Sequence, residues 1–237
     1  MGRVEPDYVI RPYRRSDRQA VRAICAATAW MGEPAPRLAG DEWIWAEYWT
    51  RFFTDRDRRA CWVVEAGRGG RIVGYLTGTA DAARFEKYVP YLLPGIVWRV
   101  IRRRLMRRRE PRRAILNLLR SLLGGEMALS ADVARRFPAA FHFNLLTEAR
   151  RRGLGSRLLR TFLGRMRTLG VPGVHAQVIS RNEASVAAMK RAGFQYVSER
   201  PLHAFAHCDS RAMTIQTWVM DLTKDRNKQQ STVEKAM

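Results

Sequence analysis

A basic turn with two glycines joins a strand-like segment to a helix-like segment in the second half of the chain. Residues 141–145 alternate as a strand does, Arg150–Ser156 form the turn, and apolar residues from Leu158 onward recur at helical spacing. The first N–H groups of a helix have no partner inside it, and the helix dipole adds positive charge at that end. Because glycine lets phosphates approach the main chain, the pattern predicts a site for a diphosphate-bearing cofactor.

Three kinds of glycine-rich turn bind diphosphates, and the sequence distinguishes among them. The nucleoside triphosphate loop requires Gly-Lys-Ser or Gly-Lys-Thr, which does not occur in this sequence. The dinucleotide turn requires a third glycine and an acidic residue about 20 positions later, and residues 172–175 contain no acid. The remaining pattern is Arg-x-x-Gly-x-Gly, formed by Arg150, Gly153 and Gly155. It resembles the pyrophosphate loop of the GNAT acetyltransferase family, which binds acetyl-coenzyme A.

The segments that follow the turn come in the order that this resemblance implies. A helix, a strand at 174–179, a second helix with Asn182 near its start, and a Gly-Phe pair leading into a strand succeed one another. The resemblance is close over residues 141–197 and extends loosely toward the N-terminus. The stretch 144–148 also looks like acetyltransferase-like domains attached to some bacterial glycoside hydrolases.

The resemblance implies an α/β (α+β) protein with the GNAT acyl-CoA N-acyltransferase fold, a mixed central sheet flanked by helices. We expect a single domain over residues 1–222. Two extended runs around the glycines of 67–70 predict a hairpin before the cofactor strand, as in the family. Residues 84–137 are expected to be a basic helical insertion, and the polar, aperiodic residues 223–237 a disordered tail.

The insertion combines many arginines with apolar residues at helical spacing. The arginines recur over 99–120, the apolar residues over 115–123, and a break is expected at Glu110-Pro111. One interpretation is a basic amphipathic surface for nucleic acid or an anionic membrane, through Arg99–Arg113. The other is a helical flap whose leucines pack on the domain while its arginines are solvated, and we favour this second interpretation.

Composition limits the partners and the compartment. The 237 residues carry a net charge of +21, which attracts anions and argues against a polycationic substrate. The three cysteines are widely spaced and form no metal-ligand pattern, so we expect a reduced cytoplasmic protein without a bound metal. No apolar run marks a secretory signal at the N-terminus.

The resemblance assigns cofactor contacts to three segments. Backbone groups of Leu145 and Leu146 are expected to meet the pantetheine arm and the thioester, and Asn182 and Ser185 to line the coenzyme from the next helix. The turn is expected to hold the pyrophosphate with Arg150, Arg151, Arg152, Gly153, Leu154, Gly155 and Ser156.

Acetyl transfer to an amine needs a base for the amine and a proton for the departing thiolate. Strand alternation places His142 and Asn144 on one face, and both are candidate catalytic residues. His142 is a candidate base, or else a strand histidine bonded to its neighbours. Glu148 is a second candidate, or else a carboxylate paired with the adjacent arginines. The family often has tyrosine where Met189 stands here, so the proton donor stays open.

The resemblance implies an N-acetyltransferase that moves acetyl from acetyl-coenzyme A to a primary amine of a small molecule or protein by direct attack. An aromatic stripe (Trp45, Tyr48, Trp49, Phe52) is interpreted as core packing in preference to a wall of the acceptor pocket. Two alternatives remain: a catalytically weak or inactive acyl-CoA-binding module, and a basic protein that binds nucleic acid or a membrane surface. A homodimer is a further option, because dimers are common in similar families.

Overall fold

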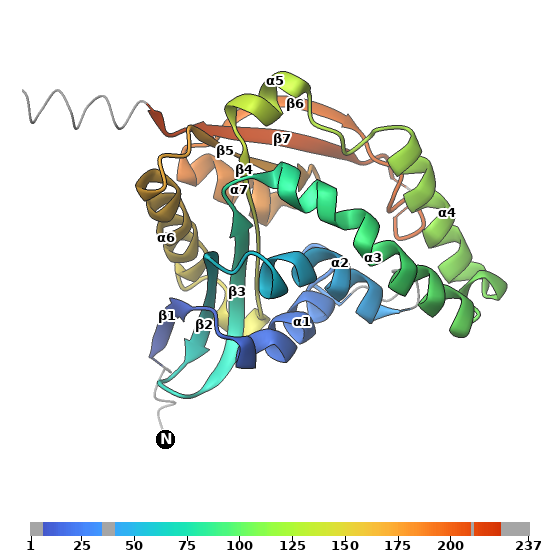
Figure 1. Cartoon of the computed structure of the whole chain (residues 1–237), viewed down its shortest axis with the longest axis horizontal. Helices are drawn as coiled ribbons and strands as arrows, with labels where there is room; N and C mark the ends of the chain where they lie inside the picture. The colour runs from blue at the N-terminus through green and yellow to red at the C-terminus, as the bar shows by residue number, and fades with distance from the viewer. Residues whose placement is uncertain (1–6, 35–40, 210, 224–237) are drawn as a thin grey trace, which may run out of the picture.

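A computed structural model describes residues 7–34, 41–209 and 211–223 of the chain (Figure 1). The expected tail, residues 223–237, lies outside this part except for its first residue. One sheet runs through the described structure. Its seven strands are β1 (Tyr8–Pro12), β2 (Ala60–Ala66), β3 (Arg71–Thr79), β4 (Ala139–Leu145), β5 (Gly173–Ile179), β6 (Gln195–Pro201) and β7 (Thr214–Asp221).

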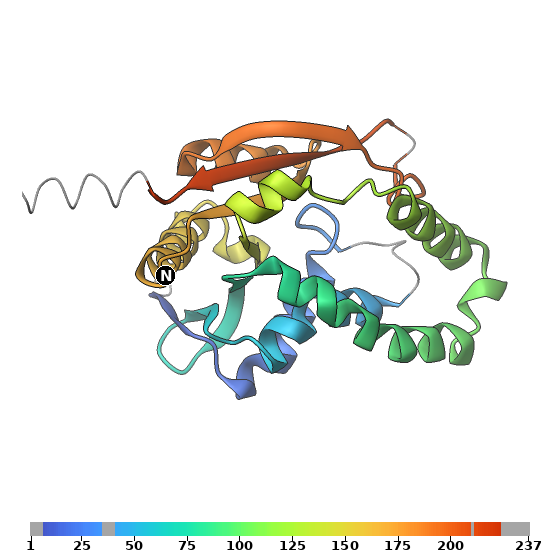
Figure 2. The ribbon, with the colours of Figure 1, turned by 45° about the horizontal axis from the view of Figure 1, so that its top comes forward.

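The strand order is β1-β2-β3-β4-β5-β7-β6, so the last strand of the chain lies between two earlier ones. Neighbouring strands are antiparallel except for β4 and β5, which run parallel. Figure 2 shows β6 and β7 (orange to red) lying apart from β1–β3 (blue to cyan). The sheet is therefore mixed, as expected, and its one parallel pair lies at its centre.

Helices cover both faces of the sheet. On one face α6 (Leu154–Thr168) packs Leu158, Phe162 and Met166 into the main core, and α7 (Glu183–Ala192) adds Met189. On the other face α1 (Arg18–Ala27) and α2 (Glu42–Asp55) form a second core with Tyr75. Burial on both sides accounts for the nearly continuous burial of β2 and β3. The minor 3-10 turns are η1 (Arg15–Asp17) and η3 (Thr147–Ala149).

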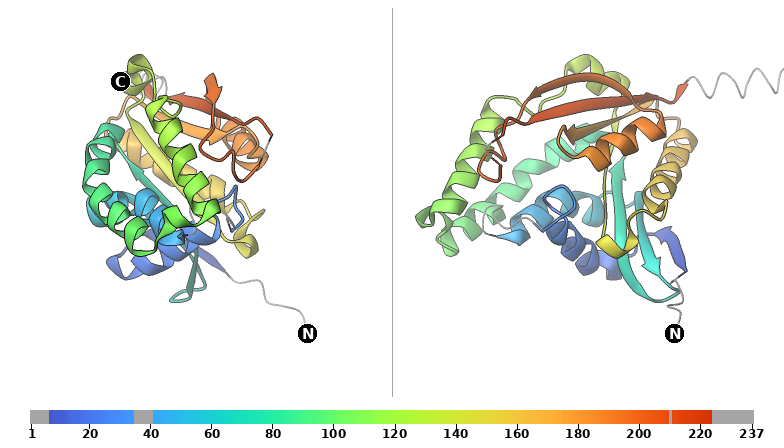
Figure 3. Two further views of the ribbon diagram at one scale, coloured as in Figure 1. Left: turned by 90° about the vertical axis from the view of Figure 1, so that its right-hand side faces the viewer. Right: turned by 180° about the vertical axis from the view of Figure 1, so that it is seen from behind.

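The insertion contains three helices, α3 (Ala82–Arg102), α4 (Arg109–Leu123) and α5 (Ala131–Arg136), with the turn η2 (Leu105–Arg107) after α3. The break lies between Arg102 and Arg109, earlier than expected, and Pro111 lies in the first turn of α4, where a missing N–H costs nothing. Figures 1 and 3 show α3 and α4 projecting from the sheet at the end opposite α6.

Candidate active site

β4 and β5 separate at the centre of the sheet. They pair at residues 139–140 of β4 and then diverge, whereas β4 stays paired with β3 as far as Leu145. The N–H of Leu146 donates to the carbonyl of Val73 at 2.8 Å, and hydrogen-bonded pairs alternate along an antiparallel ladder. Phe143 and Leu145 therefore direct their backbone polar groups away from β3, into the opening beside β5. An extended ligand arm can bind there.

Leu145 and Leu146 differ in which of their backbone groups can bind a ligand. The N–H of Leu145 faces the opening, and its carbonyl accepts from Nε of Arg150 at 3.0 Å. Leu146 is engaged at both backbone groups, because its carbonyl also accepts from the N–H of Ala149 at 2.9 Å. The N–H of Leu145 is therefore directed at the opening, whereas both backbone groups of Leu146 have partners within the protein, and contact of the two leucines with a cofactor stays a prediction.

The two glycines of the turn serve different structural purposes. Gly153 precedes α6 with φ +72°, a left-handed conformation that other residues adopt at a cost, and a Cβ there would meet open space. Gly155 lies against β4, since a Cβ at this position would be 3.3 Å from Cε2 of Phe143. Gly153 therefore sets the direction of the chain into α6, and Gly155 lets the helix start lie close to the strand. Helix geometry leaves the N–H groups of Leu154, Gly155 and Ser156 directed outward.

Arg150 points inward and ties the turn to the segment after α1. Its guanidinium contacts Glu33 Oε1 at 2.9 Å, the carbonyl of Gly32, and the carbonyl of Leu145. Arg151 and Arg152 are exposed beside the start of α6, and Nε of Arg152 donates to the carbonyl of Glu148. The three contacts give Arg150 a positioning role, and its direct pyrophosphate contact stays a prediction.

α7 begins at a capped asparagine. Asn182 is the N-cap residue, and its Oδ1 accepts from the N–H of Ser185 at 3.1 Å. This bond fixes the start of α7, while the Asn182 amide nitrogen and the Ser185 hydroxyl can still serve a ligand. Met189 is 1% exposed within the main core, so this position contributes packing.

His142 lies on the α2 side of the sheet within a polar and aromatic cluster. Its Nδ1 is 3.2 Å from the hydroxyl of Tyr75, which also accepts from Nδ2 of Asn144 at 3.2 Å. Trp49 of α2 stacks on the imidazole with the ring centroids 5.2 Å apart. His142 and Asn144 are thus brought together on one face, as strand alternation predicts, with Phe141 and Phe143 packed on the other.

Burial determines the charge of this cluster. Desolvation lowers the pKa of His142 to about 4, so the imidazole is neutral near pH 7. Desolvation also raises the pKa of Tyr75 well above its usual value, so the phenol keeps its proton. The cluster is therefore uncharged, with a hydroxyl and an amide arranged around a weakly basic imidazole.

Glu148 is placed differently from His142. Its carboxylate forms an ion pair with Arg71 of β3, and both side chains are about half exposed or more. This partner comes from β3, 77 positions away in the sequence. His142 and Glu148 lie in different local environments, and the role of Glu148 as a base stays a prediction.

Sequence reasoning missed Tyr75 and under-valued Trp49. Tyr75 stands opposite Asn144 in the β3–β4 register, a relation between residues 69 positions apart that local patterns do not contain. The aromatic residues of α2 have two different roles. Phe52 is buried in the core, as expected, whereas Trp49 contacts His142 and Trp45 contacts Phe205 of the β6–β7 loop.

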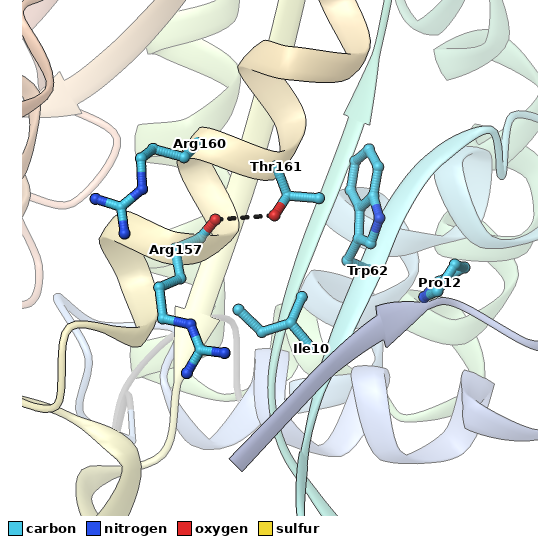
Figure 4. A pocket seen from close by; sticks show the side chains of 6 residues that line it. All are labelled: Ile10, Pro12, Trp62, Arg157, Arg160 and Thr161. Atoms are coloured by element: carbon cyan, nitrogen blue, oxygen red, sulfur yellow. Dashed lines mark hydrogen bonds between the residues drawn. The ribbon is translucent and has the colours of Figure 1, made fainter.

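A separate hollow of about 400 Å³ lies between β1, β2 and the outer side of α6 (Figure 4). Its rim carries Arg157 and Arg160 beside Trp62 and Ile10. β3 and β4 lie between its strands and the gap that separates β4 from β5. We therefore do not assign it to the active site.

Comparison with known proteins agrees with this geometry. Residues 127–194 match the model of the Acetyltransferase (GNAT) family. The solved structure of SsHAT is 26% identical, covers 92% of this chain and 99% of its own, and superposes with a TM-score of 0.68. No curated protein matches the chain by sequence.

Two further solved structures share the fold at lower identity. The putative acetyltransferase yncA from Salmonella typhimurium, with its cofactor acetyl-CoA, is 15% identical over 91% of this chain and 94% of its own, with a TM-score of 0.55. The Drosophila melanogaster polyamine N-acetyltransferase is 20% identical over 91% and 100%, with a TM-score of 0.56. The chain has the GNAT acyltransferase fold, and the match to the Acetyltransferase (GNAT) family model covers its residues 127–194. The likeness to domains attached to glycoside hydrolases stays a prediction.

Proposed function

We propose that this protein is an acetyl-CoA-dependent N-acetyltransferase that acts on a primary amine of a small molecule or protein. The observation that carries the proposal is the opening between β4 and β5, where the N–H of Leu145 lies free of β3 beside the glycine-started helix α6. A linear ligand with a diphosphate at one end matches an extended strand edge that leads to a helix N-terminus.

The residues present fit such a ligand. The N–H groups of Leu154, Gly155 and Ser156 would hold the pyrophosphate, with the positive charge of Arg151 and Arg152 beside them. The backbone of Phe143 and Leu145 would bind the pantetheine arm, and Asn182 and Ser185 would line it from α7. When bound, acetyl-coenzyme A supplies an activated acetyl group as a thioester.

The cluster around His142 would receive the acceptor amine. Its rings exclude water, and its neutral state avoids repulsion of an amine that arrives protonated. We assign Nε2, the ring nitrogen that Tyr75 does not contact, to accept the proton that the amine, once neutral, would lose as the N–C bond forms and the thioester C–S bond breaks. The departing thiolate would take a proton from water. A pKa near 4 makes this a weak base, so turnover depends on how well the acceptor is positioned.

The acceptor remains defined by its chemical class. Similar structures include a polyamine N-acetyltransferase and a putative phosphinothricin N-acetyltransferase, whose names refer to different amines. The net charge of +21 opposes accumulation of polycations and favours a neutral or anionic amine. Trp49 offers such an acceptor an aromatic face beside His142.

Calorimetric titration of acetyl-coenzyme A into the protein tests the cofactor site. The variant Ser156→Glu places a negative charge at the start of α6, where it suits the helix dipole but repels a pyrophosphate. Thr161→Glu is the matched control, because it adds the same charge to an exposed position further along α6. We expect binding to be lost in Ser156→Glu and kept in Thr161→Glu. Equal binding by both variants would refute this site.

A second candidate function is an acyl-CoA-binding module with little turnover. Met189 in the core and the low pKa of His142 favour it, because neither supplies an efficient proton donor or base. A screen of neutral, anionic and polyamine acceptors separates the two candidate functions. The measured quantity is the free thiol released from acetyl-coenzyme A. Turnover that is lost in His142→Ala while acetyl-coenzyme A still binds supports the transferase, and binding without turnover supports the module.

A further inference from the structure

α3, η2 and α4 form a helical arm, residues 82–123, that reaches away from the sheet (Figures 1 and 3). One side of the arm is anchored to the protein. Phe85 and Tyr88 of α3 pack against Phe52 of α2, and Leu118 of α4 packs beside the β6–β7 loop. The opposite side of each helix is exposed, and these exposed sides are called the outer surface of the arm.

The outer surface of α3 is apolar, which is unusual for a solvent-facing helix. Tyr91, Pro94, Trp98 and Ile101 recur at intervals of three and four residues and share one face. Tyr91 is 76% exposed and Ile101 is 69% exposed. Further exposed apolar side chains on the arm are Leu93, Val97, Met106, Leu116, Leu119, Leu122 and Leu123.

The expectation that the leucines of the insertion pack on the domain is therefore only partly right. Leu118 contacts the β6–β7 loop, whereas Leu119 and Leu122 are about half exposed and Leu123 is 90% exposed. The helix period continues past the edge of the buried face, so its outermost leucines are about half exposed or more. α4 is therefore apolar both on the side that packs on the protein and on the side that is exposed.

Arginines border these apolar groups. Those exposed on the arm are Arg102, Arg103, Arg104, Arg107, Arg108, Arg109, Arg112, Arg113 and Arg120, with the carboxylate of Glu110 among them. A hollow of about 450 Å³ is lined by Trp98, Arg99, Arg102 and Arg103. The guanidinium of Arg102 lies 4.9 Å from the indole centroid of Trp98, while Arg99 is paired with Asp41. The hollow can accept a phosphate group between an indole and two exposed guanidinium groups.

We propose that the outer surface of the helical arm docks on an anionic lipid bilayer. Amphipathic helices that bind at the membrane interface bury apolar side chains just below the headgroups, while flanking cations contact lipid phosphates. Trp98 and Tyr91 suit the interfacial layer, where amphipathic aromatic rings are enriched. Among the described residues no helix is long and apolar enough to cross a bilayer, so the arm would lie on the surface.

Two other partners fit the arm less well. A nucleic acid would satisfy the arginines but would leave the exposed side chains of Leu93, Val97 and Ile101 without an apolar partner. A second copy of the chain, paired through the same surface, would bring two sets of exposed arginines together and would be opposed by repulsion. An anionic bilayer complements both the charge and the apolar groups.

The arm lies at the end of the molecule opposite α6, as Figures 1 and 3 show from two sides. Docking through the arm would therefore leave the start of α6 open to water and to acetyl-coenzyme A. This separation makes the docking independent of the proposed function, so either can fail without the other.

Flotation of the full chain with lipid vesicles tests the proposal. Vesicles of phosphatidylcholine mixed with phosphatidylserine are compared with pure phosphatidylcholine at low and high salt. The variant Arg102→Gln/Arg103→Gln/Arg107→Gln removes charge from the arm, and Arg15→Gln/Arg58→Gln/Arg160→Gln removes the same charge from exposed positions elsewhere. We expect the arm variant to bind anionic vesicles at least about tenfold more weakly than the control variant.

An apolar variant separates lipid docking from contact with phosphate alone. Trp98→Ser/Ile101→Ser keeps every charge, and we expect it to lose anionic vesicle binding while its unfolding temperature and acetyl-coenzyme A affinity match the wild type. Three results would overturn the proposal: no vesicle binding by the wild type, unchanged vesicle binding by this variant, or a wild-type dimer in sedimentation that this variant dissociates. Tighter binding to duplex DNA than to vesicles at the same salt would assign the arm to nucleic acid instead.

Discussion

The hydroxyl of Tyr75 and Nδ1 of His142 lie 3.2 Å apart, and this contact joins β3 to β4 beneath the indole of Trp49. Asn144 completes the group by donating to the same hydroxyl. Tyr75 is fully buried, so its hydroxyl cannot exchange these partners for water without opening the protein. The contact therefore controls the orientation of the imidazole that we assign to the acceptor.

Removal of the Tyr75 hydroxyl should affect catalysis and stability together. Tyr75→Phe leaves Asn144 and His142 without a buried partner, which costs about 1–3 kcal/mol of unfolding free energy. We expect a lower kcat with an unchanged acetyl-coenzyme A affinity, because the cofactor contacts lie in the opening beside β5. Denaturant unfolding, titration and turnover measure the three quantities. A loss of cofactor affinity equal to the loss of turnover would contradict this assignment.

The pKa of His142 predicts a loss of stability in mild acid. Its pKa is lowered from 6.5 to about 4 by burial, so the unfolded chain binds a proton in this range and the folded protein does not. The stability that this group contributes is fully present above pH 6.5 and is lost as the pH falls through 4. The loss of unfolding free energy between these two pH values is at most about 3 kcal/mol.

Denaturant unfolding between pH 7 and 4 measures this effect, with His142→Gln as the reference. The pKa of His175 is also lowered by burial, so both proteins lose stability in acid, but the wild type should lose more. Parallel pH profiles for wild type and His142→Gln would show that the imidazole is better solvated than its surroundings indicate.

Local patterns were enough to predict the segment from β4 to α7. Alternation in 141–145, the glycines of the turn and the helical spacing of α6 are short-range properties, and the structure places each element as expected. Contacts between distant residues decided what could not be predicted. The position of β7 between β5 and β6 and the pairing of Arg150 with Glu33 depend on packing of the whole chain.

The exposed leucines of α4 illustrate the same limit on a smaller scale. A 3.6-residue period shows that one side of a helix is apolar, but it does not show how wide a contact the rest of the protein provides. In α4 the contact reaches Leu118 and stops before Leu119. Only the structure could show that the outer leucines join Trp98 and Ile101 of α3 as exposed groups.

Three glycines of the cofactor segment should respond differently to alanine. Gly164 lies within α6 with open space around it, so Gly164→Ala should stabilise the protein by about 1 kcal/mol. Gly153→Ala must hold φ +72°, which costs about 1–2 kcal/mol. Gly155→Ala must move Phe143, and we expect it to weaken acetyl-coenzyme A binding most, because it displaces the helix start from the strand. Thermal unfolding and titration of the three variants give both rankings, and equal effects at all three positions would contradict these roles.

Arg150 should act by positioning more than by charge. Arg150→Lys keeps the cation but cannot contact Gly32, Glu33 and Leu145 together, so we expect it to lower cofactor affinity nearly as much as Arg150→Met. Glu33→Gln should lower cofactor affinity less than either Arg150 variant. The Glu33 side chain is 64% exposed, and an exposed ion pair contributes about 1 kcal/mol or less.

Titration of acetyl-coenzyme A into the three variants decides between the two roles of Arg150. If Arg150 binds the pyrophosphate directly, Arg150→Lys should retain most of the affinity, since an ammonium also binds phosphate, and Glu33→Gln should raise the affinity by releasing the guanidinium. If it positions the turn, Arg150→Lys should resemble Arg150→Met, and Glu33→Gln should lower the affinity slightly. The opposite signs expected for Glu33→Gln make the outcome clear even where the lysine variant gives an intermediate value.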